Sequence, residues 1–220
     1  MTVVASQHWV RERIVPAEIG KYLDPDGSDW VNDAEILRLL AETEEPDPAR
    51  VRDIIAKALA VETLSQEELA RLMRVRDPGL REEIRAAAGA VKHKVYDNRI
   101  VTFAPLYLGS KCVNNCVYCG LRSSNPAVER RVLTMAEVRA ETEALAGQLG
   151  HKRLIVVYGE HPESGLDYIA ESIRTVYSVN VPARKGRGQI RRVNVNAAPM
   201  SIAELKVLHD CGLGTFQVFQ

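Results

Sequence analysis

The segment Cys112-Val113-Asn114-Asn115-Cys116-Val117-Tyr118-Cys119 is the stretch of this chain that decides its fold, and it holds three of the four cysteines in a C-x3-C-x2-C spacing. Cys thiolates hold iron–sulfur clusters, and three thiolates leave one iron of a four-iron cube open to a reactant. The alternative is a structural zinc site, which normally takes four nitrogen or sulfur ligands. Because the fourth cysteine, Cys211, is remote in the sequence, the spacing favours an open iron–sulfur cluster.

Length and charge set broad limits on the class of protein. A chain of 220 residues holds one good-sized domain or two small ones. It has 29 basic and 29 acidic residues, so no global field draws it to nucleic acid or acidic lipid. No apolar run is long enough to cross a bilayer, and the first residues do not resemble a signal peptide. Clustered cysteines are typical of a reducing compartment. We expect a cytoplasmic protein without nucleic-acid or membrane partners.

Two regions differ in their sequence period. Residues 1–95 read as a helical N-terminal extension, with four helices opening near Asn32, Asp47, Ser65 and Asp77. Asp47 and Asp77 each precede a proline, which suits an N-cap followed by the first helical position. Capping boxes are predicted at four pairs: Asn32 with Glu35, Ser65 with Glu68, Thr134 with Glu137, and Ser201 with Glu204.

Residues 96–220 alternate short β-branched runs with longer amphipathic stretches. The predicted strands are Arg99–Leu106, Arg153–Tyr158, Arg192–Ala197 and Thr215–Phe219, the first two apolar on both faces as in a buried parallel sheet. The predicted helices between them are Thr134–Leu149, Leu166–Val179 and Ser201–Cys211. This alternation predicts βαβ units, an α/β fold with a parallel sheet. Four such strands make about half of an eight-stranded barrel, so we expect a truncated chain or one part of a split protein.

Both chemically informative segments follow strands. The cysteine segment comes after the first strand, and Gly159-Glu160 comes after the second. Parallel α/β folds place their chemistry at the carboxyl ends of strands. Gly159 allows the backbone to approach a ligand closely, although Glu160 has the simpler interpretation of a solvated loop residue. His161 either orients this loop or caps it.

Other features of the sequence have structural interpretations. Asn114 and Asn115 tolerate the backbone angles of a tight loop, and Tyr118 suits simple packing. The basic run from Arg184 to Arg192 is predicted to be a solvated loop, since no aromatic residues are interleaved with it. Cys211 is predicted to be a buried small residue near a helix end.

Several motifs extend the pattern beyond the cysteines. They are 98–101, 104–107, the cysteine segment with Gly120, Gly159-Glu160-His161-Pro162, 194–199 and 212–220. Together they resemble the tyrosine-lyase family of radical S-adenosylmethionine (SAM) enzymes. Within it, the chain is more similar to the [FeFe]-hydrogenase maturases than to the tyrosine lyase of thiamine biosynthesis (2-iminoacetate synthase).

The resemblance implies a partial radical SAM (β/α) TIM-type barrel with a [4Fe–4S] cluster and SAM. Cys112, Cys116 and Cys119 would hold the cluster, Gly159 and Glu160 the methionyl ammonium of SAM, and Tyr118 would lie against the adenine. The family generates a 5′-deoxyadenosyl radical that cleaves the Cα–Cβ bond of tyrosine to p-cresol and dehydroglycine, which the maturases convert into carbon monoxide and cyanide. The implied partners are tyrosine, a one-electron reductant, and a missing C-terminal half or other hydrogenase maturases.

The chain also departs from this family. The maturases carry a second cluster on a C-terminal C-x2-C motif, which this sequence lacks. Asp97 stands where the family usually has glycine. A non-catalytic fragment that binds an iron–sulfur cluster therefore remains an alternative to the enzyme.

Overall fold

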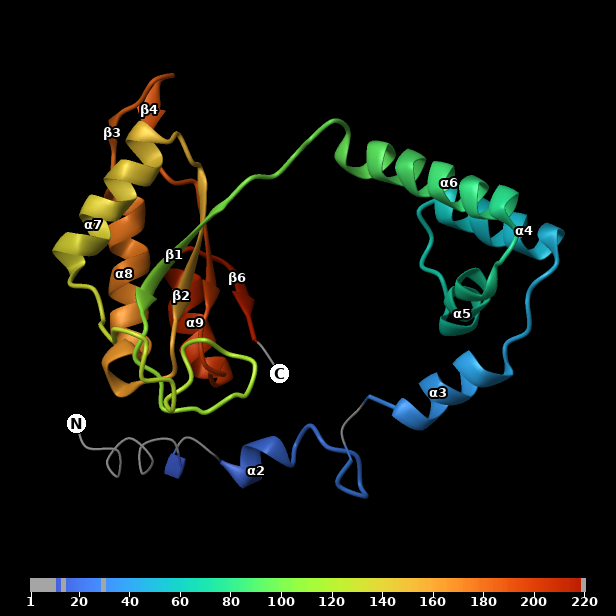
Figure 1. Ribbon diagram of the computed structural model, residues 1–220, viewed down its shortest axis with the longest axis horizontal. Coiled ribbons are helices and arrows are strands. Elements are labelled where there is room, and N and C mark those ends of the chain that lie inside the picture. The colour runs from blue at the N-terminus through green and yellow to red at the C-terminus, as the bar shows by residue number, and fades with distance from the viewer. Residues whose placement is uncertain (1–10, 13–14, 29–30, 219–220) are drawn as a thin grey trace. The chain divides into compact units, whose positions relative to one another are not determined.

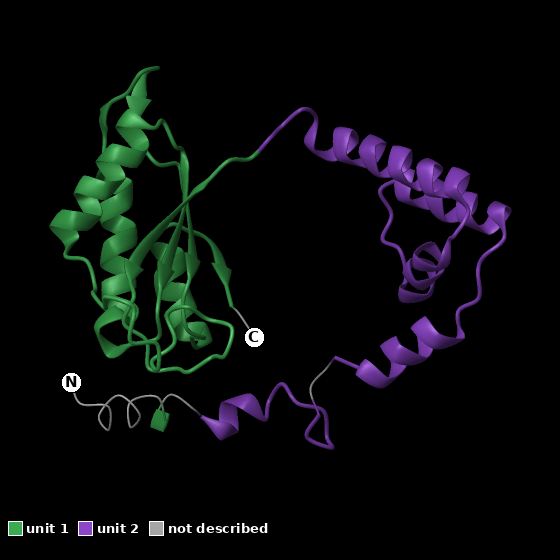
Figure 2. Ribbon diagram, in the orientation of Figure 1, with its two compact units in different colours: residues 1–14, 101–220 green, residues 15–100 purple. Residues whose placement is uncertain are grey.

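The computed structural model describes residues 11–12, 15–28 and 31–218. Two compact units divide these residues, one from 15 to 100 and one containing 101–218 (Figure 2). Most of the N-terminal stretch 1–14, which was expected to belong to the helical extension, lies outside the described residues. A domain boundary after residue 95 stays a prediction.

The first unit is helical, as the sequence predicts. Its helices are α2 (Pro16–Ile19), α3 (Asp33–Glu42), α4 (Pro48–Leu59), α5 (Gln66–Arg74) and α6 (Pro78–Tyr96). The four longer helices begin at the four predicted caps, and α2 is an addition to them (Figure 1). A small core of Val51, Val75 and Leu80 joins α4 to the segments around α5 and α6.

One of the predicted capping boxes is only half formed. The Asn32 side chain accepts a hydrogen bond from the Glu35 backbone N–H at 3.0 Å. The Glu35 carboxylate does not return the bond, because it pairs with Arg38 on the next turn. By contrast, Ser65, Thr134 and Ser201 form complete capping boxes.

The second unit is a four-stranded parallel sheet in the order β1-β2-β5-β6, which confirms the predicted α/β class (Figure 1). Its strands are β1 (Ala104–Gly109), β2 (Arg153–Tyr158), β5 (Arg192–Asn196) and β6 (Leu213–Gln217). The connecting helices are α7 (Met135–Glu143), which continues as a π-helical turn (Ala144–Gln148), α8 (Leu166–Ser178) and α9 (Ile202–Asp210).

The predicted first strand begins too early. β1 starts at Ala104 and not at Arg99, because Ala104 pairs with Leu154 at the start of β2 and earlier residues have no strand beside them. The fourth strand begins at Leu213, two positions before the predicted start, and the predicted end at Phe219 lies outside the described residues. Strand ends depend on the neighbouring strand, which the sequence of one strand does not reveal.

The basic run holds more structure than predicted. Its first part supplies the turn and the second strand of a short antiparallel hairpin, in which β3 (Val181–Pro182), just before the run, pairs with β4 (Arg187–Gly188). Gly188 packs so closely on the π-helical turn that a Cβ atom there would lie 2.7 Å from the Gly147 Cα atom. Two glycines therefore allow the hairpin to dock on the end of the α7 segment.

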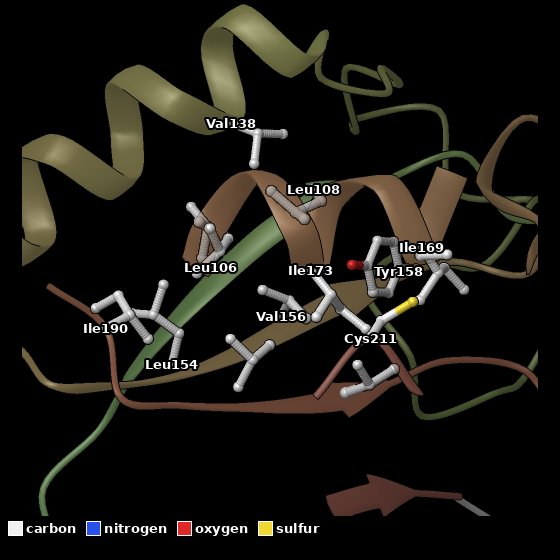
Figure 3. Close-up of a cluster of buried hydrophobic side chains, with 14 of the residues drawn as sticks. Leu106, Leu108, Val138, Leu154, Val156, Tyr158, Ile169, Ile173, Ile190 and Cys211 are labelled. Atoms are coloured by element: carbon white, nitrogen blue, oxygen red, sulfur yellow. The ribbon is translucent and has the colours of Figure 1, made fainter. Parts of the chain in front are cut away.

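The sheet is buried on one face. Leu108, Leu154, Val156 and their neighbours pack under α7, α8 and α9, where Ile173 is fully buried (Figure 3). Alternate strand residues such as Tyr107 are exposed or half-buried. The prediction that the first two strands are buried on both faces is therefore wrong for β1, whose Pro105 and Tyr107 are exposed, whereas the second face of β2 is half-buried. The open face carries the side chains that lead to the carboxyl ends of the strands.

Asp97 ends α6 with backbone angles of φ 52° and ψ −140°, which are those of glycine. A side chain at positive φ costs roughly 1–2 kcal/mol. Glycine avoids this cost, but it loses more conformational entropy on folding, which offsets part of the gain. We predict that Asp97→Gly raises the free energy of unfolding by about 0.5–1 kcal/mol in thermal or urea denaturation. Asp97→Ala is the matched control, because it removes the carboxylate and keeps the strain. An equal gain in both variants would contradict the backbone explanation.

Candidate functional site

A cleft of about 540 Å³ lies at the carboxyl ends of β1, β2 and β5. It brings together the cysteine loop (residues 110–125) and the Gly-Glu loop (residues 159–165), as expected from their places after two adjacent strands. The cysteine loop follows β1, and the Gly-Glu loop follows β2 (Figure 1). The residues lining the cleft include Cys112, Cys116, Cys119, Tyr118, Gly159 and Glu160, with Asn114, Tyr107 and the segment 196–199.

Gly159 is one of the points where the two loops touch. A Cβ atom at this position would lie 2.9 Å from the Lys111 carbonyl carbon and 3.0 Å from the Cys112 Cβ atom, and closer still to the Lys111 oxygen. The Gly159 N–H also donates to the Gly109 carbonyl at 2.8 Å. The segment that packs closely against Gly159 is therefore the cysteine loop. A side chain at position 159 would displace this loop.

Glu160 is bound to the cysteine loop twice. Its backbone carbonyl accepts a hydrogen bond from the Val113 N–H at 2.9 Å, and its carboxylate accepts one from the Asn114 amide at 2.6 Å. The carboxylate is thus fixed beside the three cysteines and lines the same cleft. Asn114, which the sequence suggested was only a loop former, contacts Glu160 directly. A carboxylate has two oxygens and about four acceptor positions, so Glu160 retains capacity for a cationic ligand.

His161 caps the turn that follows. Its Nδ1 atom accepts the Glu163 N–H at 3.2 Å, which settles its predicted role in favour of capping. Burial lowers the pKa of His161, in keeping with a nitrogen that must stay unprotonated to accept this bond. Lys111 bonds Glu163 at 2.7 and 2.8 Å, and this bond lowers the pKa of Glu163. This ion pair is a third connection between the two loops.

The three cysteines remain accessible. Cys112 and Cys119 are half-buried, and Cys116 is exposed. Tyr118 is 72% exposed along the cleft. Cys211 is packed in the core, where its thiol lies 3.1 Å from the Val207 carbonyl oxygen, as predicted for a structural cysteine (Figure 3).

The donor set of the cleft suits a cube with one open iron. Three thiols come from one loop, and no group of three or more His, Cys, Asp or Glu in the described ranges is arranged around one ion position. In a cube each cysteine binds a different iron, so the thiolates need not converge on one point. The Asn196 Oδ1 atom is buried and has no hydrogen-bond partner among the described atoms, and Asn196 lines the cleft. Such an orphaned acceptor suits a ligand that carries a donor.

The chain matches the radical SAM superfamily over residues 106–218, the segment that contains both loops and all four strands. It belongs to the radical SAM superfamily. Members of this family use a [4Fe–4S] cluster and SAM, which confirms the cofactors expected from the cysteine spacing. No helix of the described residues is long and apolar enough to cross a membrane.

Comparison with solved structures and curated proteins confirms the suspected branch. The chain is similar to a structure of HydG, described as a maturase of the [FeFe]-hydrogenase, with 41% identity, a TM-score of 0.78, and coverage of 87% of this chain and 41% of HydG. The HydG of Carboxydothermus hydrogenoformans is 32% identical over 84% of this chain and 41% of its own, with a TM-score of 0.68. The 2-iminoacetate synthase of Escherichia coli (strain K12) is 27% identical over 76% of this chain. The chain spans about two fifths of the length of these relatives.

The contact at Gly159 leads to a test that needs no cofactor. We predict that Gly159→Ala lowers the free energy of unfolding by about 1–3 kcal/mol, because backbone must move to admit the methyl group. Gly120→Ala is the matched control in the same cleft, since a Cβ atom at Gly120 meets nothing within 4 Å. Thermal denaturation of both variants without cluster measures the difference. Equal melting temperatures would show that the two loops are not packed against each other through Gly159.

Proposed function

We propose that this chain forms the cluster- and SAM-binding part of a radical SAM tyrosine lyase of the HydG type. The observation that carries the proposal is the cleft in which three thiols and a fixed carboxylate meet at adjacent strand ends. Similarity to HydG at 41% identity over most of the chain supports it.

In this proposal, Cys112, Cys116 and Cys119 each bind one iron of the cube. When bound and reduced, the cluster supplies the electron that cleaves the sulfur–C5′ bond of SAM. A one-electron reductant is therefore a required partner. The protein's part is to place the ligands and to exclude water from the radical. A reducing, cytoplasmic setting belongs to the proposal, because it keeps the thiols available.

Glu160 binds the methionyl ammonium of SAM, aided by the small neighbouring Gly159. A carboxylate that is already oriented by Asn114 loses little freedom on binding a cation, so the bond is favourable. Tyr118 lines the same cleft, and its ring is proposed to lie against the adenine. Asn196 has an acceptor oxygen left for a donor group of the bound molecules.

The proposed substrate is tyrosine, which is cleaved at the Cα–Cβ bond to p-cresol and dehydroglycine. The reaction would serve assembly of the hydrogenase cofactor. The proposed partners are other maturases or a C-terminal half of the barrel. The second candidate is 2-iminoacetate synthase of thiamine biosynthesis, which is favoured by the similarity to the Escherichia coli protein over 76% of the chain. The higher identity and wider coverage of HydG support the first candidate.

Replacing any one of Cys112, Cys116 and Cys119 by Ala is predicted to abolish assembly of the cube. Cys211→Ala is the control, because this thiol lies in the core. Iron content and the EPR signal of the reduced, anaerobically reconstituted protein measure the outcome. In the unaltered chain, the signal should change when SAM is added. Tight zinc binding without iron uptake would exclude the proposed site.

Glu160→Gln is predicted to weaken SAM binding about tenfold to hundredfold, because one charge-assisted hydrogen bond contributes roughly 1.5–3 kcal/mol. Asp167→Asn is the control, since that carboxylate is exposed in the first turn of α8 and does not line the cleft. The measurement is a SAM titration of the reconstituted variants. An unchanged dissociation constant in Glu160→Gln, with the cluster intact, would refute the assignment.

The substrate is tested by incubating the reconstituted chain with SAM, tyrosine and dithionite. We expect 5′-deoxyadenosine, with p-cresol as the marker of tyrosine cleavage, and no carbon monoxide, because this chain has no cysteine pair for a second cluster. SAM cleavage without any p-cresol would count against tyrosine as the substrate of this chain. Carbon monoxide formed without an added partner would show that the second cluster is not required.

A further inference from the structure

Arg130 lies outside the cysteine motif, yet its guanidinium is bonded to the backbone on both sides of it. Nη1 donates to the Ser110 carbonyl at 3.1 Å and to the Leu121 carbonyl at 2.9 Å. Nη2 donates to the Arg122 carbonyl at 2.5 Å and to the Asn125 carbonyl at 3.2 Å. One side chain therefore connects the residue at the start of the cysteine loop to three residues that follow the last cysteine.

Other hydrogen bonds also hold the loop, including one from the Ser124 hydroxyl to the Asn115 side chain and those from Val113 and Asn114 to Glu160. The Ser123 N–H donates to the Asn114 carbonyl at 2.7 Å, and the Asn125 amide donates to the Gly120 carbonyl at 2.8 Å. No strand or helix holds residues 110–125 along their length. The guanidinium is charged, so each of its hydrogen bonds to a half-buried carbonyl is stronger than a bond between two neutral groups. With four hydrogen bonds, the Arg130 guanidinium joins the start of this segment to the residues after its last cysteine.

We propose that Arg130 is a positioning residue that holds the cysteine loop in the conformation that accepts the cluster. The role depends on the planar fork of the guanidinium, which presents five N–H donors in fixed directions. A lysine ammonium has the same charge but only three donors on one atom, so it cannot reach four carbonyls around a plane. The inference rests on the proposed cluster at these cysteines.

The next residue along the chain provides a matched control. Arg131 is also an arginine, but its guanidinium pairs with Glu137 at the start of α7 instead of with these four carbonyls. The Arg131 backbone does bond Ser110, and a change of side chain leaves the backbone groups in place. Comparing variants at the two positions therefore distinguishes the effect of the guanidinium hydrogen bonds from the effect of losing one positive charge in this region.

The first experiment uses the full chain without cluster. Amide hydrogen exchange is measured in Arg130→Lys, Arg130→Gln and Arg131→Gln, and peptides from residues 110–125 are compared with peptides from α8. We expect at least tenfold faster exchange in the cysteine loop of both Arg130 variants and no change in α8 or in Arg131→Gln. Unchanged loop exchange in the Arg130 variants would overturn the proposal whether or not the chain binds a cluster.

The second experiment uses the reconstituted protein and measures the rate at which a chelator removes iron. Loss should be about tenfold to hundredfold faster in both Arg130 variants, as is common when a residue that orients metal ligands is removed. Methylguanidinium, but not methylammonium, should slow the loss in Arg130→Ala, a rescue that a general loss of stability would not give. Retention by Arg130→Lys equal to that of the unaltered chain would show that charge alone suffices. Absence of a cluster in the unaltered chain would refute the proposed function and leave the exchange result to decide on Arg130.

Discussion

The candidate site depends on the contact between Gly159 and the backbone of Lys111 and Cys112. The two strand-end loops can pack together only because this position has no side chain. The bonds from Val113 and Asn114 to Glu160 then fix the distance between the thiols and the carboxylate. The parallel pairing of β1 with β2 holds the two strands in register. The geometry of the cleft therefore follows from the sheet and from the absence of a Cβ atom at Gly159.

The sheet supplies rigidity from one side only. Its buried face packs under α7, α8 and α9, with Tyr158 among the buried side chains (Figure 3). Directly before the Gly-Glu loop, the Tyr158 hydroxyl shares a 2.6 Å hydrogen bond with the Ser172 hydroxyl. Burial raises the pKa of Tyr158 far above its usual value, so this bond stays between neutral hydroxyls. On the opposite face, side chains such as Tyr107 are exposed or half-buried. Rigid support behind the strand and open space in front of it are what a site for a reactive intermediate needs.

Local features of the chain were predictable because their causes are local. The caps at Ser65, Thr134 and Ser201 need only residues three positions apart, and the helices begin where those pairs predict. The cysteine spacing identified the family and its cofactors, and strand alternation placed both loops at one edge of the sheet. The start of β1 was missed because it depends on where β2 begins. Glycine at position 159 was expected to face a ligand, whereas its closest neighbour is the protein itself.

Residues whose function depends on distant neighbours left no signal in the sequence. Asn114 suited a loop in any setting, and only the fold brings it to Glu160. Arg130 is one of two adjacent arginines that look alike in the sequence, and they differ only in what surrounds them: carbonyls of the cysteine loop in one case, Glu137 in the other. A backbone carbonyl is present at every residue, so recognition of carbonyls cannot be read from residue types. The cysteine motif could therefore suggest which residues would bind a cluster, whereas the contacts of Arg130 with the loop around them could be found only from the geometry.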